Sequence, residues 1–174
     1  MRELFWLKQD TRNHVFEVDI PDSVISVRDR LDGNVASLKQ TTILNMLYSA
    51  EGEKRFDVHD RGIFMVSKKV KEVFEIFCPD MEYREIFVVD SENKRQQHFY
   101  APLLPFSSIE CKITRPQGLN GERQLEIFGG KELMGEVFRV RSHMDSCTVV
   151  SLFVAEAILR IGCKNVQLIP VRMP

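Results

Sequence analysis

The chain has 174 residues, of which 44% are apolar and 28% are charged. This length and composition are typical of a globular protein that buries its own core, and they are too apolar for a disordered chain. The 24 Lys and Arg residues are balanced by 25 Asp and Glu residues, so the net charge is −1. This balance argues against a dedicated nucleic-acid-binding protein, which normally carries a clear excess of basic residues.

The apolar segments are too short to cross a membrane. The longest apolar runs span four residues, as at residues 63–66, whereas a membrane-spanning helix needs about 20. The first residues carry charges at positions 2, 3 and 8 and lack the apolar centre of a signal peptide. The sequence therefore predicts a protein that makes no membrane contact and lies in the cytoplasm.

The cysteines point to the same compartment. The chain contains Cys78, Cys111, Cys147 and Cys163, and no two of them form a Cys-x-x-Cys pair. Four dispersed cysteines in a chain of this length do not predict a disulfide framework. We expect free, mostly buried thiols in a reducing environment.

Alternation of apolar and polar residues predicts strands along most of the chain. Strands are expected first at residues 2–8 and 15–20, and residues 42–48 alternate in a way that fits a strand or a helix. Further strands are expected at residues 85–89, 97–101, 124–128, 137–141 and 166–169. Turns are expected at residues 32–34, 51–53, 90–94, 118–121 and 129–130, where glycine or short polar residues gather.

Two amphipathic helices are predicted, over residues 68–77 and 152–161, because each has an apolar stripe at helical spacing. Ser67 and Ser151 precede them and are suited to cap their first turns with a side-chain oxygen. Pro79 follows the first helix, and Gly162 fits the left-handed position that ends many helices. The lysines at positions 68, 69 and 71 are expected to form the solvated face of the first helix.

The two helices belong to segments that match each other. Residues 64–86 align without gaps with residues 148–170, and each reads strand, serine, helix, turn, strand. The fold class predicted from these patterns is α+β, with a mostly antiparallel sheet and two main helices. The match between the segments further suggests two pseudo-repeated strand–helix–strand units. A single domain over residues 1–174 is the simplest expectation, with a strand-rich N-terminal part at residues 1–60.

The densest group of reactive side chains lies between two predicted elements. His143, Asp145 and Cys147 would share one face of a strand, as metal ligands or a Cys–His nucleophile pair could. The alternative is a turn, with Asp145 bonded locally and Cys147 buried. A second polar group, at residues 57–60, is expected to form a solvated loop.

Four segments taken together resemble a known family. They are FMVSKKVK at residues 64–71, FYAPLL at 99–104, VFRV at 137–140, and VAEAILR at 154–160, which Gly162 follows. They resemble, over about residues 60–172, a bacterial family of immunity proteins of polymorphic toxin systems, formerly a domain of unknown function. Its members show a VS-x-x-V-K helix start, a Y-x-P-x-L strand exit, an F-R strand and a closing V-A/E-S-x-L-R-R-G helix. This chain has Ile161 at the second arginine position and its own His-Met-Asp-Ser-Cys insert.

The resemblance makes residues 61–174 the family-like part and implies a cytoplasmic immunity protein. Such a protein binds and neutralises a cognate bacterial toxin by non-catalytic protein–protein interaction. The family has no agreed active residue, so no catalytic, cofactor-binding or metal-binding residue is assigned, no cofactor is expected, and the toxin-binding residues are unknown. The expected partner is a toxin domain, with no nucleic acid and no membrane, and the oligomeric state is left open. The alternative function is an enzyme of unrecognised type with a site near His143, Asp145 and Cys147.

Overall fold

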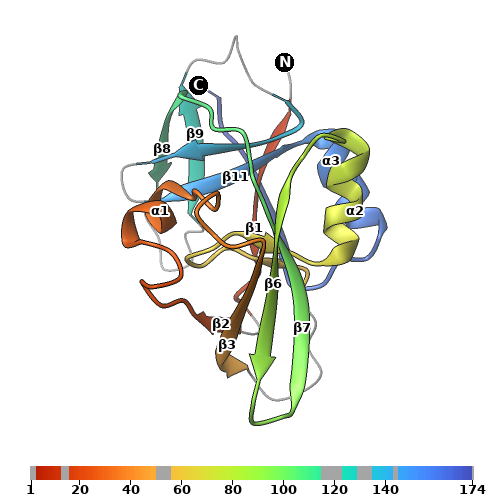
Figure 1. The fold of residues 1–174 in the computed structure, drawn as a ribbon. Coiled ribbons are helices and arrows are strands. Elements are labelled where there is room, and N and C mark those ends of the chain that lie inside the picture. Colours follow the sequence, from red (N-terminus) through yellow and green to blue (C-terminus); the bar gives the residue numbers. More distant parts are fainter. Residues whose placement is uncertain are drawn as a thin grey trace.

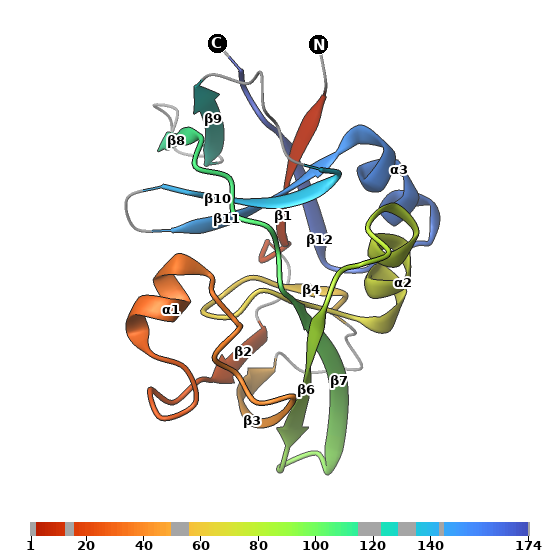
Figure 2. The same ribbon diagram turned by 45° about the horizontal axis from the view of Figure 1, so that its top comes forward.

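The structure is a computed structural model that describes residues 3–12, 16–49, 56–114, 123–128, 135–142 and 145–173. Within these residues the chain forms three helices and twelve strands, and nearly all neighbouring strands run antiparallel. The predicted α+β class with mostly antiparallel sheets is confirmed. Figures 1 and 2 show two sheets placed one above the other, with two helices side by side along one flank.

The upper sheet, here called sheet A, is wholly antiparallel. Its strand order is β10 (Val137–Arg141), β11 (Ser146–Ser151), β1 (Leu4–Gln9) and β12 (Val166–Pro170). A separate hairpin-like pair, β8 (Glu110–Thr114) and β9 (Gln124–Phe128), packs against one face of this sheet. The N-terminal strand β1 therefore occupies an interior position between two strands from the C-terminal part of the chain.

The lower sheet, sheet B, contains one parallel pair. Its order is β2 (Phe16–Asp19), β3 (Thr41–Ser49), β6 (Tyr83–Asp90), β7 (Arg95–Pro102), β5 (Met65–Val66) and β4 (Val58–His59), and β3 runs parallel to β6. The short helix α1 (Val27–Asp32) lies in the connection from β2 to β3. The segment around α1 contributes Ile25, Val35 and Leu38 to the apolar cluster on one face of sheet B, and residues next to β4 and β5 contribute Phe56 and Ile63.

The two helices α2 (Lys68–Phe77) and α3 (Leu152–Arg160) pack against each other where the two sheets meet. Val70 and Phe74 of α2 share an apolar cluster with Val154 and Ile158 of α3. The same cluster contains Leu7 of sheet A and residues of the β4–β5 hairpin. Apolar burial is the main stabilising term in folding, so the helices join the two sheets through a common core.

Both strand–helix–strand units predicted from the sequence are present, and they share one topology. The first consists of β5, α2 and β6, and the second of β11, α3 and β12. In the first unit β7 lies between β5 and β6 and is antiparallel to both. In the second unit β1 lies between β11 and β12 in the same manner. The outer strands of each unit are thus parallel to each other and separated by a third strand.

Most predicted elements are confirmed, with small shifts at their ends. Each predicted strand corresponds to an observed one, and residues 42–48, which fitted a strand or a helix, belong to β3. The helix α1 and the strand β8 were not predicted. The turns expected at residues 51–53, 118–121 and 129–130 lie outside the described residues. Among the described helices, none has the length and apolar character needed to cross a membrane.

The helix caps follow the prediction in part. The hydroxyl of Ser151 accepts a hydrogen bond from the backbone N–H of Val154 at 3.5 Å, and Gly162 has the expected positive φ of 66°. Ser67 does occupy the position before α2, but its side chain makes no cap. Its hydroxyl instead donates to the carboxylate of Asp57 at 2.6 Å.

The solvated loop predicted at residues 57–60 is wrong. Asp57, Val58 and His59 are buried, and the last two form β4, so this stretch is no solvated loop. The carboxylate of Asp57 also accepts the backbone N–H of Lys164 at 2.7 Å. Because both of its oxygens have donors inside the protein, the polar side chain is accommodated in the interior.

Candidate functional site

A cavity opens where the strands β1 and β11 separate. Their pairing ends at Leu7 and Thr148, although β1 continues to Gln9 and β11 begins at Ser146. The turn between β4 and β5 enters the gap, and the carboxylate of Asp60 accepts the backbone N–H of Gln9. The remaining cavity has a volume of about 770 Å³, which is within the range of small-molecule sites.

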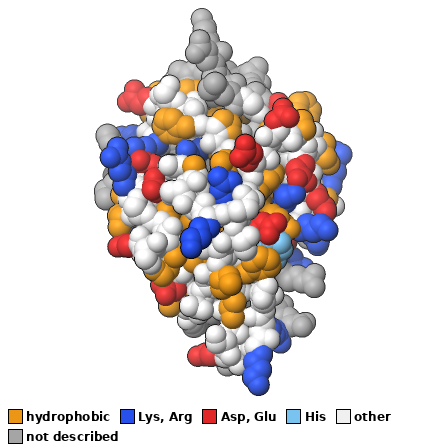
Figure 3. All heavy atoms as spheres, viewed as in Figure 1, with side chains coloured by type: hydrophobic (Ala, Val, Ile, Leu, Met, Phe, Trp, Pro, Cys, Tyr) orange, Lys and Arg blue, Asp and Glu red, His pale blue; other side chains and the backbone are white. Residues whose placement is uncertain are grey.

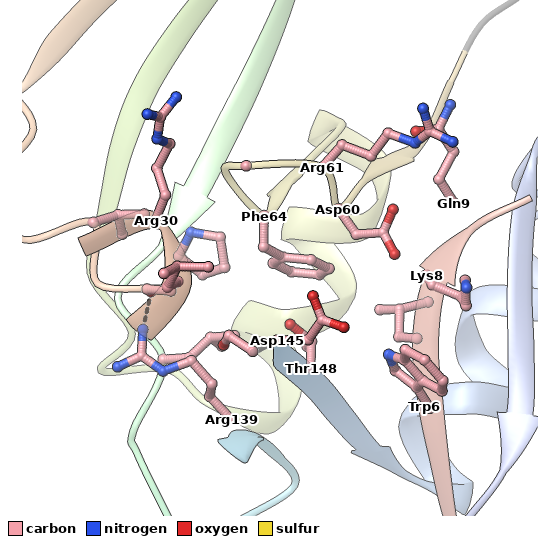
Figure 4. Close-up of a pocket in the computed structure, with 18 of the residues that line it drawn as sticks. Trp6, Lys8, Gln9, Arg30, Asp60, Arg61, Phe64, Arg139, Asp145 and Thr148 are labelled. Carbon is pink, nitrogen blue, oxygen red and sulfur yellow. Dashed lines mark hydrogen bonds between the residues drawn. The ribbon is translucent and has the colours of Figure 1, made fainter. Parts of the chain in front are cut away.

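The cavity is lined by β1, β10 and β11 of sheet A, by the α1 segment and by the β4–β5 turn (Figure 4). Its lining residues therefore come from distant parts of the chain. Its lining is richer in cationic than in acidic side chains. The charged residues are Lys8, Arg30, Arg61, Arg123 and Arg139, against Asp60 and Asp145. A concave, low-dielectric surface with an excess of one charge concentrates the electric field, which here favours anions.

Three of these cations already have carboxylate partners. The pairs are Arg30 with Asp22, Arg61 with Glu17, and Arg123 with Asp145. Within the described part of the chain, Lys8 and Arg139 have no carboxylate at ion-pair distance. These two side chains are therefore the ones whose charge is least compensated.

The β1 side of the cavity combines a cation, an amide and an acid. The Lys8 ammonium lies 4.6 Å from the centre of the Trp6 ring, in a cation–π contact. Burial raises the pKa of Asp60, and the nearby Lys8 charge opposes this shift. The carboxamide of Gln9 is buried, and in the described structure neither its nitrogen nor its oxygen has a hydrogen-bond partner.

On the opposite side of the cavity, Arg139 of β10 lines the wall, and Arg139 and Arg141 together hold the end of α1. Arg139 donates to the backbone oxygen of Gly33, and Arg141 lies 2.6 Å from the carboxylate of Asp32. Burial lowers the pKa of the Arg139 guanidinium. Its Nε is buried and has no partner among the described residues. Cations near the C-terminus of a helix interact favourably with its free backbone carbonyls. The two arginine contacts therefore hold the end of α1 against β10, beside the cavity.

Of the residue cluster predicted from the sequence, the two described members, Asp145 and Cys147, do not lie together in one site. His143 lies outside the described residues. Asp145 is exposed, lines the cavity and lies 3.6 Å from Arg123. Cys147 is fully buried in the apolar cluster between sheet A and the β8–β9 pair, and burial raises the pKa of its thiol. A protonated, buried thiol is a poor nucleophile, so Cys147 does not supply the reactive group of this cavity.

The metal hypothesis gains no geometric support from the same region. Within the described residues, no three His, Cys, Asp or Glu side chains are grouped as metal ligands would be. All four cysteines are free thiols, as expected.

A second feature is the outward face of sheet B, formed by β3, β6 and β7. Ile43 and Leu47 of β3 are 69% and 64% exposed. Ile43 pairs with Phe87 of β6, and Asn45 pairs with Val89. Figure 3 shows hydrophobic side chains gathered in the lower half of the molecule, where Figure 1 places these strands. We call this surface the β3–β6–β7 face.

Aromatic rings continue this face toward α2. Phe87 stacks on His98 with ring centres 4.2 Å apart, and His98 contacts Tyr100 at 4.4 Å. The ammonium of Lys71 lies about 5 Å from the rings of Tyr83 and Tyr100. Lys71 is therefore partly covered and not simply a solvated lysine, whereas Lys68 and Lys69 are exposed as expected.

Signals for these features were present in the sequence only in part. Along β3 both alternating sets of residues are apolar, with Leu44 and Met46 on one side and Ile43 and Leu47 on the other. Such a strand is either covered on both faces or leaves one apolar face exposed. The cavity had no comparable signal, because it arises from the separation of strands that are about 140 residues apart in the chain.

Comparison with known proteins adds no relative: no family model and no curated protein matches the chain. The resemblance to immunity proteins therefore rests on the segments quoted above.

Proposed function

We propose that this chain is a cytoplasmic immunity protein that binds a cognate toxin domain and neutralises it without catalysis. The observation that carries the proposal is the exposed, apolar and aromatic β3–β6–β7 face. The resemblance over residues 60–172 supports it, and free thiols fit a reducing compartment.

The composition of this face is that of a protein-binding surface. Centres of protein interfaces are rich in aromatic and large apolar side chains and poor in charge. Ile43, Leu47 and Phe87 supply such side chains on a rigid sheet. Single exposed apolar side chains are common on protein surfaces, but Ile43, Leu47 and Phe87 lie on one face of the same sheet.

The proposal expects the toxin domain to be encoded beside this chain's gene, and the test is co-expression of the two. The wild-type chain is expected to restore growth and to form a stoichiometric complex. The substitutions Ile43→Asp and Leu47→Asp are each expected to weaken the complex by at least about tenfold, because each places a charge in an apolar interface. Binding is measured with the purified domains by calorimetry.

A matched control is available on α3. Leu159 is 68% exposed and lies away from the β3–β6–β7 face, so Leu159→Asp makes the same chemical change elsewhere. This variant is expected to protect as well as the wild type. Equal killing with and without the wild-type chain would refute the immunity function. Full protection by both β3 variants would refute the assignment of this face.

A further inference from the structure

We propose that the cavity between β1, α1 and the β4–β5 turn binds a ring-bearing organic phosphate of mononucleotide size. This inference is independent of toxin binding, because it rests on a different surface. Three observations support it: the charge of the lining, the donors on the β10–β11 side, and the amide and rings on the β1 side.

The charge of the lining fits a phosphate monoester. Of the five cationic side chains that line the cavity, three are paired with carboxylates, which leaves Lys8 and Arg139 without an ion-pair partner in the described structure. A phosphate monoester carries about −1.5 to −2 at pH 7. The protein as a whole has a net charge of −1, so the cationic excess is local. An anion in the cavity would pair with charge that the protein's own carboxylates leave uncompensated.

The phosphate is assigned to the side formed by β10 and β11. Arg139 and Thr148 are direct neighbours across these strands, and Ser146 also lines the cavity. A guanidinium and two hydroxyl groups on one rigid sheet form a typical set of phosphate donors. Arg139 uses one nitrogen for Gly33, which orients the side chain and leaves its other donors available.

The ring is assigned to the β1 side. In Figure 4 the ring of Phe64 lies between Arg139 on one side and Lys8 and Gln9 on the other. The Gln9 carboxamide offers an unused donor and an unused acceptor, the combination that pairs with the edge of a heterocyclic base. Trp6 and Phe64 supply aromatic surface to this part of the lining.

The buried amide of Gln9 also affects the expected stability of the protein without ligand. A buried amide without hydrogen bonds is destabilising, and an apolar residue of similar size would avoid that loss. Its presence at the cavity is explained if a bound molecule completes its hydrogen bonds. Gln9→Met is therefore expected to keep or raise the melting temperature while it weakens ligand binding.

The test is calorimetric titration of the full chain with the four ribonucleoside monophosphates, with adenosine and inorganic phosphate as separate probes. At least one nucleotide is expected to bind with a stoichiometry of one, at least about tenfold more tightly than either probe. Gln9→Met and Arg139→Met are each expected to weaken that nucleotide by about tenfold. The matched controls Gln96→Met and Arg160→Met, at exposed positions outside the cavity, are expected to bind as the wild type does.

Three results would overturn the proposal. The first is that no nucleotide binds at millimolar concentration. The second is that inorganic phosphate binds as tightly as the nucleotides, and the third is that both cavity variants bind nucleotide as the wild type does. If the loss of its contact with Gly33 keeps Arg139→Met from folding, the result for Gln9→Met decides between the outcomes, because the Gln9 amide makes no hydrogen bond within the described structure.

Discussion

His59 is a titratable side chain placed in the apolar interior of the protein. Its ring is fully buried, and Nδ1 lies 3.2 Å from the backbone oxygen of Ile63, to which it donates as the neutral ring. Burial lowers the pKa of His59 to about 4, because a charged imidazolium would lose its hydration. The folded protein therefore holds a neutral histidine where the unfolded chain would take up a proton.

This burial predicts a loss of stability in mild acid. The folded pKa of about 4 lies below the ordinary value of 6.5, so the unfolded state binds more protons between these values and stability falls as the pH falls below 6.5. About 2 kcal/mol should be lost between pH 7 and pH 5. Urea unfolding of the wild type and His59→Gln at both pH values checks this. The variant should lose clearly less, and an equal loss would contradict the assignment.

Gly33 and Gly162 form a matched pair for a second prediction. Both have φ near +65°, but a Cβ on Gly33 would lie 2.4 Å from the Ser146 hydroxyl, whereas one on Gly162 meets nothing within 4 Å. Gly162→Ala should cost about 1 kcal/mol from backbone strain alone. Gly33→Ala should cost roughly 2 kcal/mol or more, because the end of α1 must also move away from sheet A. Urea unfolding of both variants measures the difference, and equal losses would show that this packing does not constrain Gly33.

At the scale of elements, Asp57 links three of them. Its carboxylate accepts from the Ser67 hydroxyl at the start of α2 and from the backbone N–H of Lys164 before β12. Its backbone oxygen also accepts the N–H of Ser67. One buried residue thus ties β4 to both strand–helix–strand units.

This link predicts non-additive mutations. Asp57→Ala should cost roughly 3 kcal/mol, because it removes two charge-assisted hydrogen bonds. Ser67→Ala should cost about 1–2 kcal/mol alone and much less when Asp57 is already alanine. Denaturant unfolding of the two single variants and the double variant gives the coupling energy. Simple additivity would show that the hydroxyl and the carboxylate do not depend on each other.

The elements that could be predicted from the sequence are those with a local signal. The helix at residues 68–77 matches α2 because its apolar stripe and the following Pro79 are local features. The burial of residues 57–59 was missed because it depends on donors from α2 and from Lys164, far away in the chain. Likewise, the cavity and the pairing of β1 with β11 and β12 depend on contacts between opposite ends of the sequence, which no local pattern encodes.

For the molecule as a whole, β1 is the strand on which sheet A depends. It pairs with β11 on one side and with β12 on the other, and Leu7 belongs to the core shared by both sheets. Loss of β1 would expose two strand edges and a large apolar surface. Sheet A therefore requires both ends of the chain at once.

Removal of residues 1–9 is accordingly expected to abolish cooperative folding, whereas removal of residues 1–3 leaves β1 in place and should preserve it. Circular dichroism during thermal unfolding distinguishes the two truncated chains. A cooperative transition in the shorter chain would mean that sheet A forms without its interior strand. Because most contacts of sheet A are long-range, the full chain should also fold more slowly than a helical protein of its size.

The shared topology of the two units has a consequence for the order of the chain. The backbone N–H of Val171 donates to the oxygen of Leu4 at 2.9 Å, so the two ends of the described chain are adjacent, as Figure 2 also shows. A short peptide bridge between them would turn β12 and β1 into a hairpin. The second unit would then read β11, α3, β12, β1, in the same order as β5, α2, β6, β7. The two units would then have the same order along the chain. A circular permutant opened at the β6–β7 turn would instead separate the last strand from the first unit.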